Sequence, residues 1–426
     1  MNKKTHYQVD VLERFIPISL EMLISDLLVS GLLPVEQQSM FKQFCNSYLA
    51  VFHAQSYSQL QSLKNIYRPF NPDRDSLTTI ITDINEQLKH LKSEVYEVLE
   101  NANFEQLSEN ELNEALNKTS PHGVKVSVDF EEFSEAALFY RGVAIQTKSH
   151  RNWKKFPFKK QAIDVQIYRR LFVLLQPKNR QQWIKHLVAT KKMSLKKAEK
   201  SAETTFKILG LNGDEDVVYM KLFKDIPRAD LEMLFPNTRI QMRLFDKVKL
   251  GVMGGSGTAG GVMATLSKFS VAIDPISALL TIGGFLGVLW RQIAKIFSQR
   301  AKYSAVLTKN LYFYSLDNNM GALTYLVDMA ETEECKEAIL SYFFLLIEGQ
   351  TNRDELDKSI EAYISDQYSI PMDFEIDDGL DKLKKSLLLF CKDGVLQTLP
   401  IAEANLVLQQ QWNHIIENNS DSITEV

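Results

Sequence analysis

The sequence of 426 residues is poor in cysteine and lacks the short motifs that identify common enzyme classes. Its three cysteines, Cys45, Cys335 and Cys391, are widely separated and form no CxxC pair. This pattern fits a reducing compartment and argues against a disulfide framework and a thiolate zinc site. No GxxxxGK[ST], HExxH or GxSxG motif occurs. The sequence therefore nominates no catalytic residue, no cofactor-binding residue and no metal ligand.

The N-terminus also lacks a recognisable targeting signal. Lys3 and Lys4 are not followed by the apolar run of a signal peptide, and no transit pattern rich in Arg and Ser appears. If the chain enters a membrane, an internal segment must take it there.

Charge is nearly absent from one internal window, in which glycine is concentrated. Between Lys249 and Arg291 only Lys268 and Asp274 are ionisable, and nine of the 18 glycines lie between positions 251 and 287. A helix that crosses a membrane needs about 20 predominantly apolar residues. The stretches 250–267 and 269–290 satisfy this length. We therefore predict a two-helix transmembrane hairpin over residues 247–298.

Flanking charges and glycine spacing add detail to this hairpin. Lys and Arg precede and follow the window, which by the positive-inside rule places both termini in the cytoplasm, either at a bacterial inner membrane or, in a eukaryote, at a mitochondrial membrane. Pairs of glycines four positions apart let two helices pack closely, within the hairpin or in a homo-oligomer. The glycines expected to pack are Gly251, Gly255, Gly257, Gly261, Gly283 and Gly287.

Two other interpretations of the window were considered. Residues 255–260 match GxGxxG, but a dinucleotide site needs a buried strand before the motif and an acidic residue about 20 positions after it. The preceding segment is charged, and Asp274 comes too early. A soluble protein that buries the hairpin in its own core stays open as an alternative.

On both sides of the window the pattern predicts a mostly helical α+β protein. Residues 1–123 are expected to form a helical N-terminal region, with a helix over 77–101 capped by Asp75 or Ser76 and a capping box from Ser108 to Glu111. Residues 124–246 alternate between apolar and polar positions as strands do, which indicates a central α+β domain.

The C-terminal residues 299–426 are expected to form a helical, winged-helix-like module. A helix is predicted over 301–326, and another from Glu334 ends at Gly349. Two more helices, a hairpin that turns at Lys392-Asp-Gly and a last helix complete the order of elements found in winged-helix folds.

Basic and acidic residues are unevenly distributed. Residues 141–200 contain 17 Lys or Arg against two acidic residues, whereas residues 331–426 contain seven basic and 20 acidic residues. The acidic C-terminal part makes nucleic acid an improbable partner and favours protein surfaces, including the basic tract itself. The basic tract suits anionic headgroups of membrane lipid. The residues nominated for that contact are Arg151, Trp153, Lys154, Lys155, Lys159 and Lys160.

Three short blocks of sequence are similar to the transmembrane protein 143 family. They are Arg14-Phe-Ile-Pro17, Leu138-Phe-Tyr-Arg-Gly142 and the longer Lys221–Pro236, which stands directly before the glycine-rich window. The resemblance implies a membrane-associated protein with two crossings. It implies no established activity and no catalytic residue.

The longest block also has a direct physical interpretation. Lys224 ends a strand and a short helix follows, for which Asp225 is expected to be the cap and Pro227 to lie in the first turn. Asp230 and Glu232 favour its N-terminal end, but two residues apart on a helix they face different directions and cannot share a ligand. Pro236 is expected to stop the helix. We interpret the block as a structural connector.

The favoured hypothesis is a membrane-anchored, non-enzymatic interaction or scaffold protein. A membrane-linked enzyme that acts on an anionic or phosphate-bearing substrate is the first alternative. A soluble helical protein with a buried glycine-rich hairpin is the second.

Overall fold

The computed structural model describes most of the chain outside the glycine-rich window. The described residues are 12–75, 83–112, 125–151, 160–209, 216–235, 239–241 and 311–424. They form an α+β protein that is mostly helical and whose sheets are antiparallel, as the sequence predicts. The hairpin predicted at 247–298 lies outside them.

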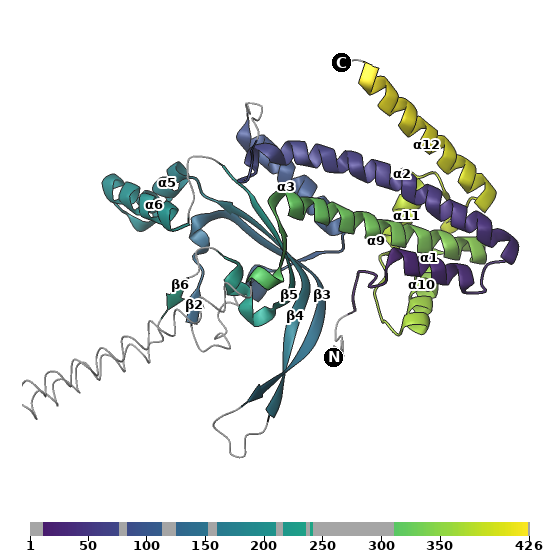
Figure 1. Cartoon of the computed structure of the whole chain (residues 1–426), viewed down its shortest axis with the longest axis horizontal. Helices are drawn as coiled ribbons and strands as arrows, with labels where there is room; N and C mark the ends of the chain where they lie inside the picture. Colours follow the sequence, from purple (N-terminus) through teal and green to yellow (C-terminus); the bar gives the residue numbers. More distant parts are fainter. Residues whose placement is uncertain are drawn as a thin grey trace, which may run out of the picture.

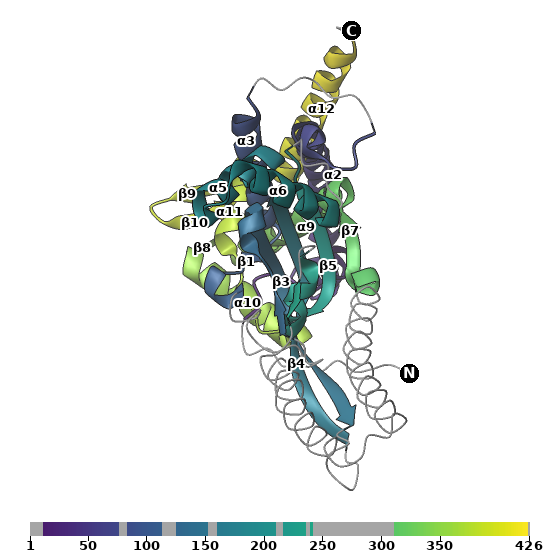
Figure 2. The same ribbon diagram turned by 90° about the vertical axis from the view of Figure 1, so that its left-hand side faces the viewer.

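A five-stranded antiparallel sheet forms the centre of the molecule, in the order β1-β3-β4-β5-β7. β3 and β4 are the longest strands, with 19 and 18 residues, and their paired far ends project beyond the other described elements (Figure 2). A separate ladder joins β2 to β6. The strands are β1 (Glu105–Gln106), β2 (Lys125–Ser127), β3 (Phe133–Arg151), β4 (Lys160–Pro177), β5 (Tyr219–Pro227), β6 (Arg239–Gln241) and β7 (Ser315–Asn318).

Helices come from three parts of the chain (Figure 1). The N-terminal set is α1 (Leu20–Val29), α2 (Val35–Tyr67) and α3 (Ile84–Asn101). Between β4 and β5 the chain forms α5 (Arg180–Lys191) and α6 (Leu195–Leu209), and the 3-10 helices η2 (Phe130–Glu132) and η3 (Arg228–Leu234) precede β3 and follow β5. The C-terminal set is α9 (Asn319–Glu348), α10 (Arg353–Tyr368), α11 (Ile376–Lys385) and α12 (Ile401–Thr424).

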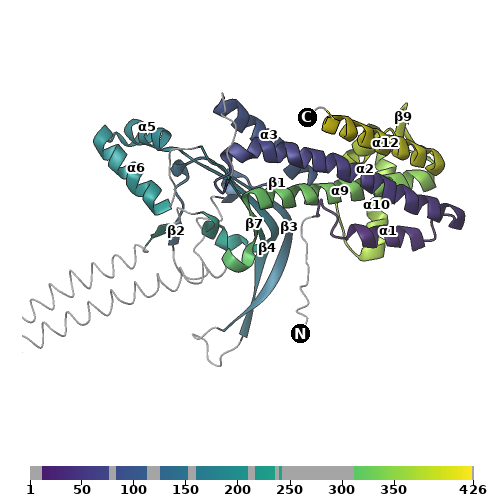
Figure 3. The same cartoon turned by 45° about the horizontal axis from the view of Figure 1, so that its top comes forward.

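The long helices α2 and α9 lie side by side, and each contributes to two hydrophobic cores (Figure 3). In the first core, Phe41 and Phe44 of α2 pack against Tyr342 and Phe343 of α9, together with α1 and α10–α12. In the second core, the other halves of the same helices cover one face of the sheet with α3. The N-terminal and C-terminal regions therefore share one helical core, in which the sheet domain takes no part.

The opposite face of the sheet is covered by a third cluster. Most of its members come from β3, β4, β5 and η3. Phe235, which comes before the glycine-rich window, also belongs to it, and Leu311 and Tyr314, which come after the window, pack against it. A fourth cluster is small and lies only between α5 and α6.

The C-terminal strands form a three-stranded antiparallel sheet in the order β8-β10-β9. Its strands are β8 (Gln350–Thr351), β9 (Leu389–Lys392) and β10 (Val395–Thr398). Asp393 and Gly394 make the two-residue turn between β9 and β10, with φ of 54° and 80°. Both values suit the turn type that tight hairpins favour, so the turn predicted at this position is confirmed.

Two local predictions were wrong and one was confirmed. The stretch 301–326 is not one helix, because residues 315–318 form the edge strand β7, which hydrogen-bonds to β5. The helix α3 begins at Ile84, where the side chain of Asp83 caps it, and not near position 77. The capping box at Ser108 is confirmed, since Ser108 and Glu111 each accept a backbone N–H bond from the other residue.

Candidate functional site

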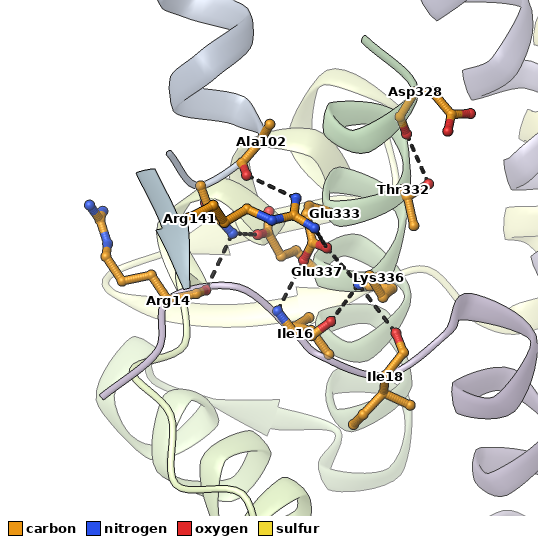
Figure 4. A network of polar contacts seen from close by, with 11 residues as sticks. Arg14, Ile16, Ile18, Ala102, Arg141, Asp328, Thr332, Glu333, Lys336 and Glu337 are labelled. Carbon is orange, nitrogen blue, oxygen red and sulfur yellow. Dashed lines mark hydrogen bonds and ion pairs between the residues drawn. The ribbon is translucent and has the colours of Figure 1, made fainter. Parts of the chain in front are cut away.

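A network of buried charges joins the sheet to the helical core at the point on α9 where its two cores meet (Figure 4). Residues of α9 up to Ala330 belong to the core under the sheet, and those from Cys335 belong to the helical core. Between and beside them Glu333, Lys336 and Glu337 are buried. Buried charges are costly unless they are paired and hydrogen-bonded, so their partners define this junction.

The ammonium group of Lys336 has a hydrogen-bond acceptor for each of its three donors. Its Nζ donates to the backbone oxygens of Ile16 and Ile18 at 2.6 and 3.3 Å, and to Glu333 Oε1 at 2.7 Å. An ammonium group has three N–H donors, and each has an acceptor here. Burial lowers the pKa of Lys336, and the adjacent Glu333 carboxylate opposes that shift.

Glu333 receives bonds from three directions. Its Oε2 accepts the backbone N–H of Ile16 at 3.0 Å, and its Oε1 lies 3.4 Å from a guanidinium nitrogen of Arg141 on β3 as well as close to Lys336. Arg141 also donates to the carbonyl oxygen of Ala102 at 3.1 Å. The extended segment before α1 is thereby tied to α9 and to the sheet at once.

Glu337 completes the network with one oxygen still unpaired. Its Oε1 accepts from Asn103 Nδ2 at 2.8 Å, while its Oε2 is buried without a hydrogen-bond partner among the described residues. Burial raises the pKa of this carboxyl well above its usual range; the bond from Asn103 opposes the shift, and the nearby Glu333 adds to it. Asn103 also reaches the carbonyl oxygen of Arg14 at 3.3 Å.

Phe15 is held in the same junction by two arginines and a glycine. The guanidinium carbons of Arg141 and Arg169 lie 4.8 and 5.9 Å from the centre of its ring. Gly142 has a φ of +76°, and a Cβ atom at this position would lie 2.9 Å from the Phe15 ring. Glycine is therefore required here both for the backbone conformation and for the close approach.

The segment that carries Phe15 also reaches the C-terminal helices. Glu13 accepts the backbone N–H of Val143 at 3.0 Å, and its own carbonyl oxygen accepts from Asp373 N at 3.1 Å. Arg14 forms an ion pair with Glu375, just before α11. Residues 13–18 are consequently a strap between β3, α9 and the loop that leads into α11.

Two of the three short blocks singled out in the sequence meet in this network. Arg14–Pro17 lies against the end of the block Leu138–Gly142, through the contacts of Phe15 with Arg141 and Gly142. Sequence reasoning missed the acidic and basic residues of α9 that hold them. The run Glu331-Thr-Glu-Glu-Cys-Lys-Glu337 resembles a solvated helix face, and the signal to the contrary is the strongly apolar run that follows it in the same helix.

The third block, Lys221–Pro236, begins in β5, an inner strand that lies between β4 and β7 in the sheet. Lys224, Asp225 and Pro227 end β5, and Asp230 lies in η3. The expectation that Asp225 caps the helix is wrong, because Asp225 is an exposed strand residue with φ of 52° and the N-cap position belongs to Pro227. The predicted order of a strand end followed by a short helix is confirmed.

The two aspartates of this block differ in their surroundings. Asp225 is exposed and Asp230 is buried. Both add to the rise that burial causes in the pKa of Tyr314, so both act on the residue at which the chain returns to the sheet. The side chain of Glu232 and the whole of Pro236 lie outside the described residues.

The other nominated residues are only partly described. Arg151 and Lys160 pair at the far end of the β3–β4 ladder, and nothing is described of their side chains. Trp153, Lys154, Lys155 and Lys159 lie outside the described residues. So do the glycines of the predicted membrane hairpin, Gly251, Gly255, Gly257, Gly261, Gly283 and Gly287.

Neither a metal-binding cluster nor a membrane-spanning helix is present among the described residues. Within the ranges given above, no cluster of three or more His, Cys, Asp or Glu side chains is arranged to hold a metal ion. Among the helices that the structure describes, none combines the length and apolar character needed to cross a membrane.

Comparison with known protein families identifies the centre of the chain. A family described as "protein of unknown function (DUF3754)" matches residues 133–321, from the first residue of β3 to the first turn of α9. A DUF3754 domain spans this region. The DUF3754 domain thus contains Arg141 and Gly142 of the junction, whereas the strap and Glu333, Lys336 and Glu337 lie outside it. No solved structure matches the chain.

Proposed function

We propose that the protein is a membrane-anchored, non-enzymatic scaffold. The anchor is the hairpin predicted at 247–298, and the DUF3754 domain and the helical core lie together on the cytoplasmic side of a bacterial inner membrane, or on the equivalent side of a mitochondrial membrane. The resemblance to the transmembrane protein 143 family stays part of this proposal.

The observation that carries the proposal is where the chain leaves and re-enters the described structure. Leu231 and Phe235 come before the glycine-rich window and belong to one hydrophobic cluster, and Leu311 and Tyr314, which come after the window, pack against the same cluster. A membrane hairpin needs its two ends close together on the same side of the bilayer. The shared cluster supplies that arrangement.

Exposed aromatic residues stand at the point of re-entry. Tyr312 is 79% exposed and Phe313 is 59% exposed, and their rings contact each other edge to face. Aromatic side chains are enriched where a chain passes between water and the bilayer. Their position supports an interface at this end of the DUF3754 domain, to which the basic tract around Arg151 and Lys160 would add contacts with anionic headgroups.

The helical end of the molecule suits a protein partner. Its elements α9, β8, α10, α11, β9 and β10 follow the order of a winged helix, with a sheet in the order β8-β10-β9. Its sequence is strongly acidic, which opposes contact with nucleic acid phosphates. We therefore assign the scaffold's partner-binding role to this end.

Alkaline carbonate extraction of membranes from cells that express the full chain tests the anchor. We expect the protein to stay in the membrane pellet. A matched control replaces residues 247–298 with a short Gly/Ser linker, which the shared cluster of Phe235 and Leu311 makes feasible, and this variant should move to the supernatant. Release of the wild-type chain would refute the anchor.

Cysteine labelling tests whether both soluble parts lie on one side. Cys391 is exposed, whereas Cys45 and Cys335 are buried. An impermeant maleimide should label Cys391 from the same membrane side as a cysteine introduced into the DUF3754 domain by Gln181→Cys, at an exposed position of α5, in a Cys391→Ser background. Labelling from opposite sides would contradict the hairpin topology.

A further inference from the structure

We propose that the α5–α6 helix pair is a second, peripheral membrane contact, and that its tip, residues 188–197, binds an anionic lipid surface. This inference rests on the proposed function only in that it takes the membrane to be present. It assigns a role to a part of the DUF3754 domain that takes no part in the buried charge network.

The pair is a protrusion with its own small core. Trp183 and Leu187 of α5 pack against Ala198, Ala202 and Phe206 of α6, and Figure 1 shows both helices at one end of the molecule. The base is held by the capping box of Asn179 with Gln182 at the start of α5. The outer surface of the pair is therefore available for a partner.

That surface carries unneutralised positive charge. Six lysines of the pair are exposed and form no ion pair with any other described residue, and only Glu199 and Glu203 on the same helices oppose them. Clustered charge of one sign attracts a partner of the other sign. The six are Lys185, Lys192, Lys196, Lys197, Lys200 and Lys207.

Apolar side chains lie among the lysines at the tip. Leu195, the first residue of α6, is 61% exposed, and Val188 near the end of α5 is 38% exposed. Exposed aliphatic residues surrounded by lysines are typical of segments that dip into the headgroup region of a bilayer while the lysines meet phosphates. The tip therefore presents both the exposed aliphatic side chains and the lysines that such a contact needs.

The same residues do not suit nucleic acid. Sites for nucleic acids use arginine forks and exposed aromatic rings for stacking. The aromatic rings of α5 and α6 that could stack, Trp183 and Phe206, are buried, and Arg180 lies at the base of the pair and not at its tip. We therefore favour a lipid surface over RNA or DNA.

The pair lies near the point where the chain leaves for the predicted anchor. Lys191 at the end of α5 forms a 3.0 Å ion pair with Glu131 of η2. Glu131 is four residues after Ser127 of β2, so at most about 14 Å of chain separates Ser127 from Glu131. Ser127 in turn pairs with Arg239 at the beginning of β6. Figure 1 shows α5, α6, β2 and β6 at the same end of the molecule. A membrane entered after β6 would thus be within reach of the tip.

A fluorescent reporter on the tip tests the contact in the full chain. In a Cys391→Ser background, Leu195→Cys is labelled with an environment-sensitive dye, and the protein is reconstituted into vesicles of phosphatidylcholine with or without phosphatidylglycerol. We expect a blue shift and quenching by brominated lipid only when phosphatidylglycerol is present. Lys192→Gln/Lys196→Gln/Lys197→Gln should abolish both signals, and high salt should weaken them.

A matched reporter controls for general effects of the vesicle. Leu406→Cys on α12 replaces a leucine of nearly equal exposure, 59%. Figure 1 shows α12 at the opposite end of the molecule from α5 and α6, so this dye should not respond to phosphatidylglycerol. Equal emission from the Leu195→Cys dye in both vesicle types would overturn the inference. A shift produced by poly-uridine RNA and not by vesicles would overturn the choice of lipid.

Carbonate extraction of the same preparation separates this inference from the proposed anchor. If the protein resists extraction but the Leu195→Cys dye is silent, the tip contact fails and the anchor stands. If carbonate releases the protein while the dye still responds to added anionic vesicles, the anchor fails and the tip contact stands.

Discussion

Lysine is used in opposite ways in the junction on α9 and in the α5–α6 pair. Lys336 is buried, and all three of its donors have acceptors from Glu333, Ile16 and Ile18. Lys196 is exposed and has no ion pair with any other residue that the structure describes. The first lysine stabilises the connection between distant parts of the chain, and the second leaves its charge available to a partner.

The difference shows that local charge does not reveal what a charged residue does. The sequence around Lys336 is acidic and that around Lys196 is basic, so composition alone suggested a protein-binding surface for the former and a surface for anionic headgroups for the latter. Burial and hydrogen-bond partners reverse the first of these interpretations. The following predictions test whether the contrast between the two regions holds.

Lys336→Met should have the largest effect on stability. It leaves the carbonyl oxygens of Ile16 and Ile18 without their donor and removes a buried countercharge from Glu333. Breaking a buried charge pair from one side typically costs about 3–5 kcal/mol. Urea denaturation of the purified chain, followed by circular dichroism, measures the loss in the free energy of unfolding.

The matched control is Lys196→Met, which removes the same charge from the α5–α6 pair. Substitutions at exposed positions of this kind change the free energy of unfolding by within about 0.5 kcal/mol. If the two variants were equally stable, the contrast between the two regions would disappear.

Gly142→Ala should have the second largest effect. The positive φ of +76° costs an L-residue about 1–2 kcal/mol, and the new Cβ would also press on the ring of Phe15. Gly394→Ala is the control, because Gly394 has a similar φ of +80° but nothing within 4 Å of a Cβ atom.

The difference between the two alanine variants isolates the contact with Phe15. We expect Gly142→Ala to be less stable than Gly394→Ala by at least about 1 kcal/mol, since overpacking adds to the backbone strain. In the double variant Gly142→Ala/Phe15→Leu, the loss of stability that is due to the backbone strain at position 142 should remain. Equal losses of stability in Gly142→Ala and Gly394→Ala would show that the strap can move away from the new methyl group at little energetic cost.

Glu337→Gln should change how the free energy of unfolding depends on pH. Its difference from wild type should be smallest near pH 5. Because burial raises the pKa of Glu337 in the folded chain, the folded state holds its proton more tightly than the unfolded state. The contribution of this group to stability is therefore fully present below the unfolded pKa of about 4.3 and is lost as pH rises toward the folded pKa.

Glutamine imitates the protonated carboxyl. As pH rises from 5 to 8, the free energy of unfolding of Glu337→Gln should therefore fall less than that of wild type. Urea denaturation across this range measures the slope. Glu36→Gln, at an exposed position on α2, should keep the wild-type slope. If the free energy of unfolding of Glu337→Gln fell with pH as steeply as that of wild type, the raised pKa of Glu337 in the folded chain would be contradicted.

Much of the fold was predictable where local signals and packing agree. Alternation of apolar and polar positions predicted strands in the central region, and the Asp393-Gly394 turn predicted the hairpin of β9 and β10. The end of α9 was also correct, because Gly349 has a φ of +82° that only glycine adopts readily. The domain boundaries at 123, 246 and 298 stay predictions.

The misses have a common physical cause, which is the dominance of distant contacts over local pattern. β7 was taken as helix because its four residues carry no strand alternation, and β5 supplies the pairing that makes them a strand. The charges at Glu333, Lys336 and Glu337 were not nominated because, apart from the local pair of Glu333 and Lys336, their partners lie more than 190 positions earlier in the chain. No local spacing could have revealed them.

The joint helical core has a consequence for how the chain is made. Phe41 and Phe44 emerge from the ribosome roughly 300 residues before Tyr342 and Phe343, the side chains against which they pack. At a synthesis rate of about 5–20 residues per second, the apolar faces of α1 and α2 wait for roughly 15–60 s without their partners. Throughout that interval these exposed apolar faces make the nascent chain prone to aggregation. A premature stop codon before α9 would make this exposure permanent, so truncated products should be cleared by proteolysis even when their DUF3754 residues are nearly complete.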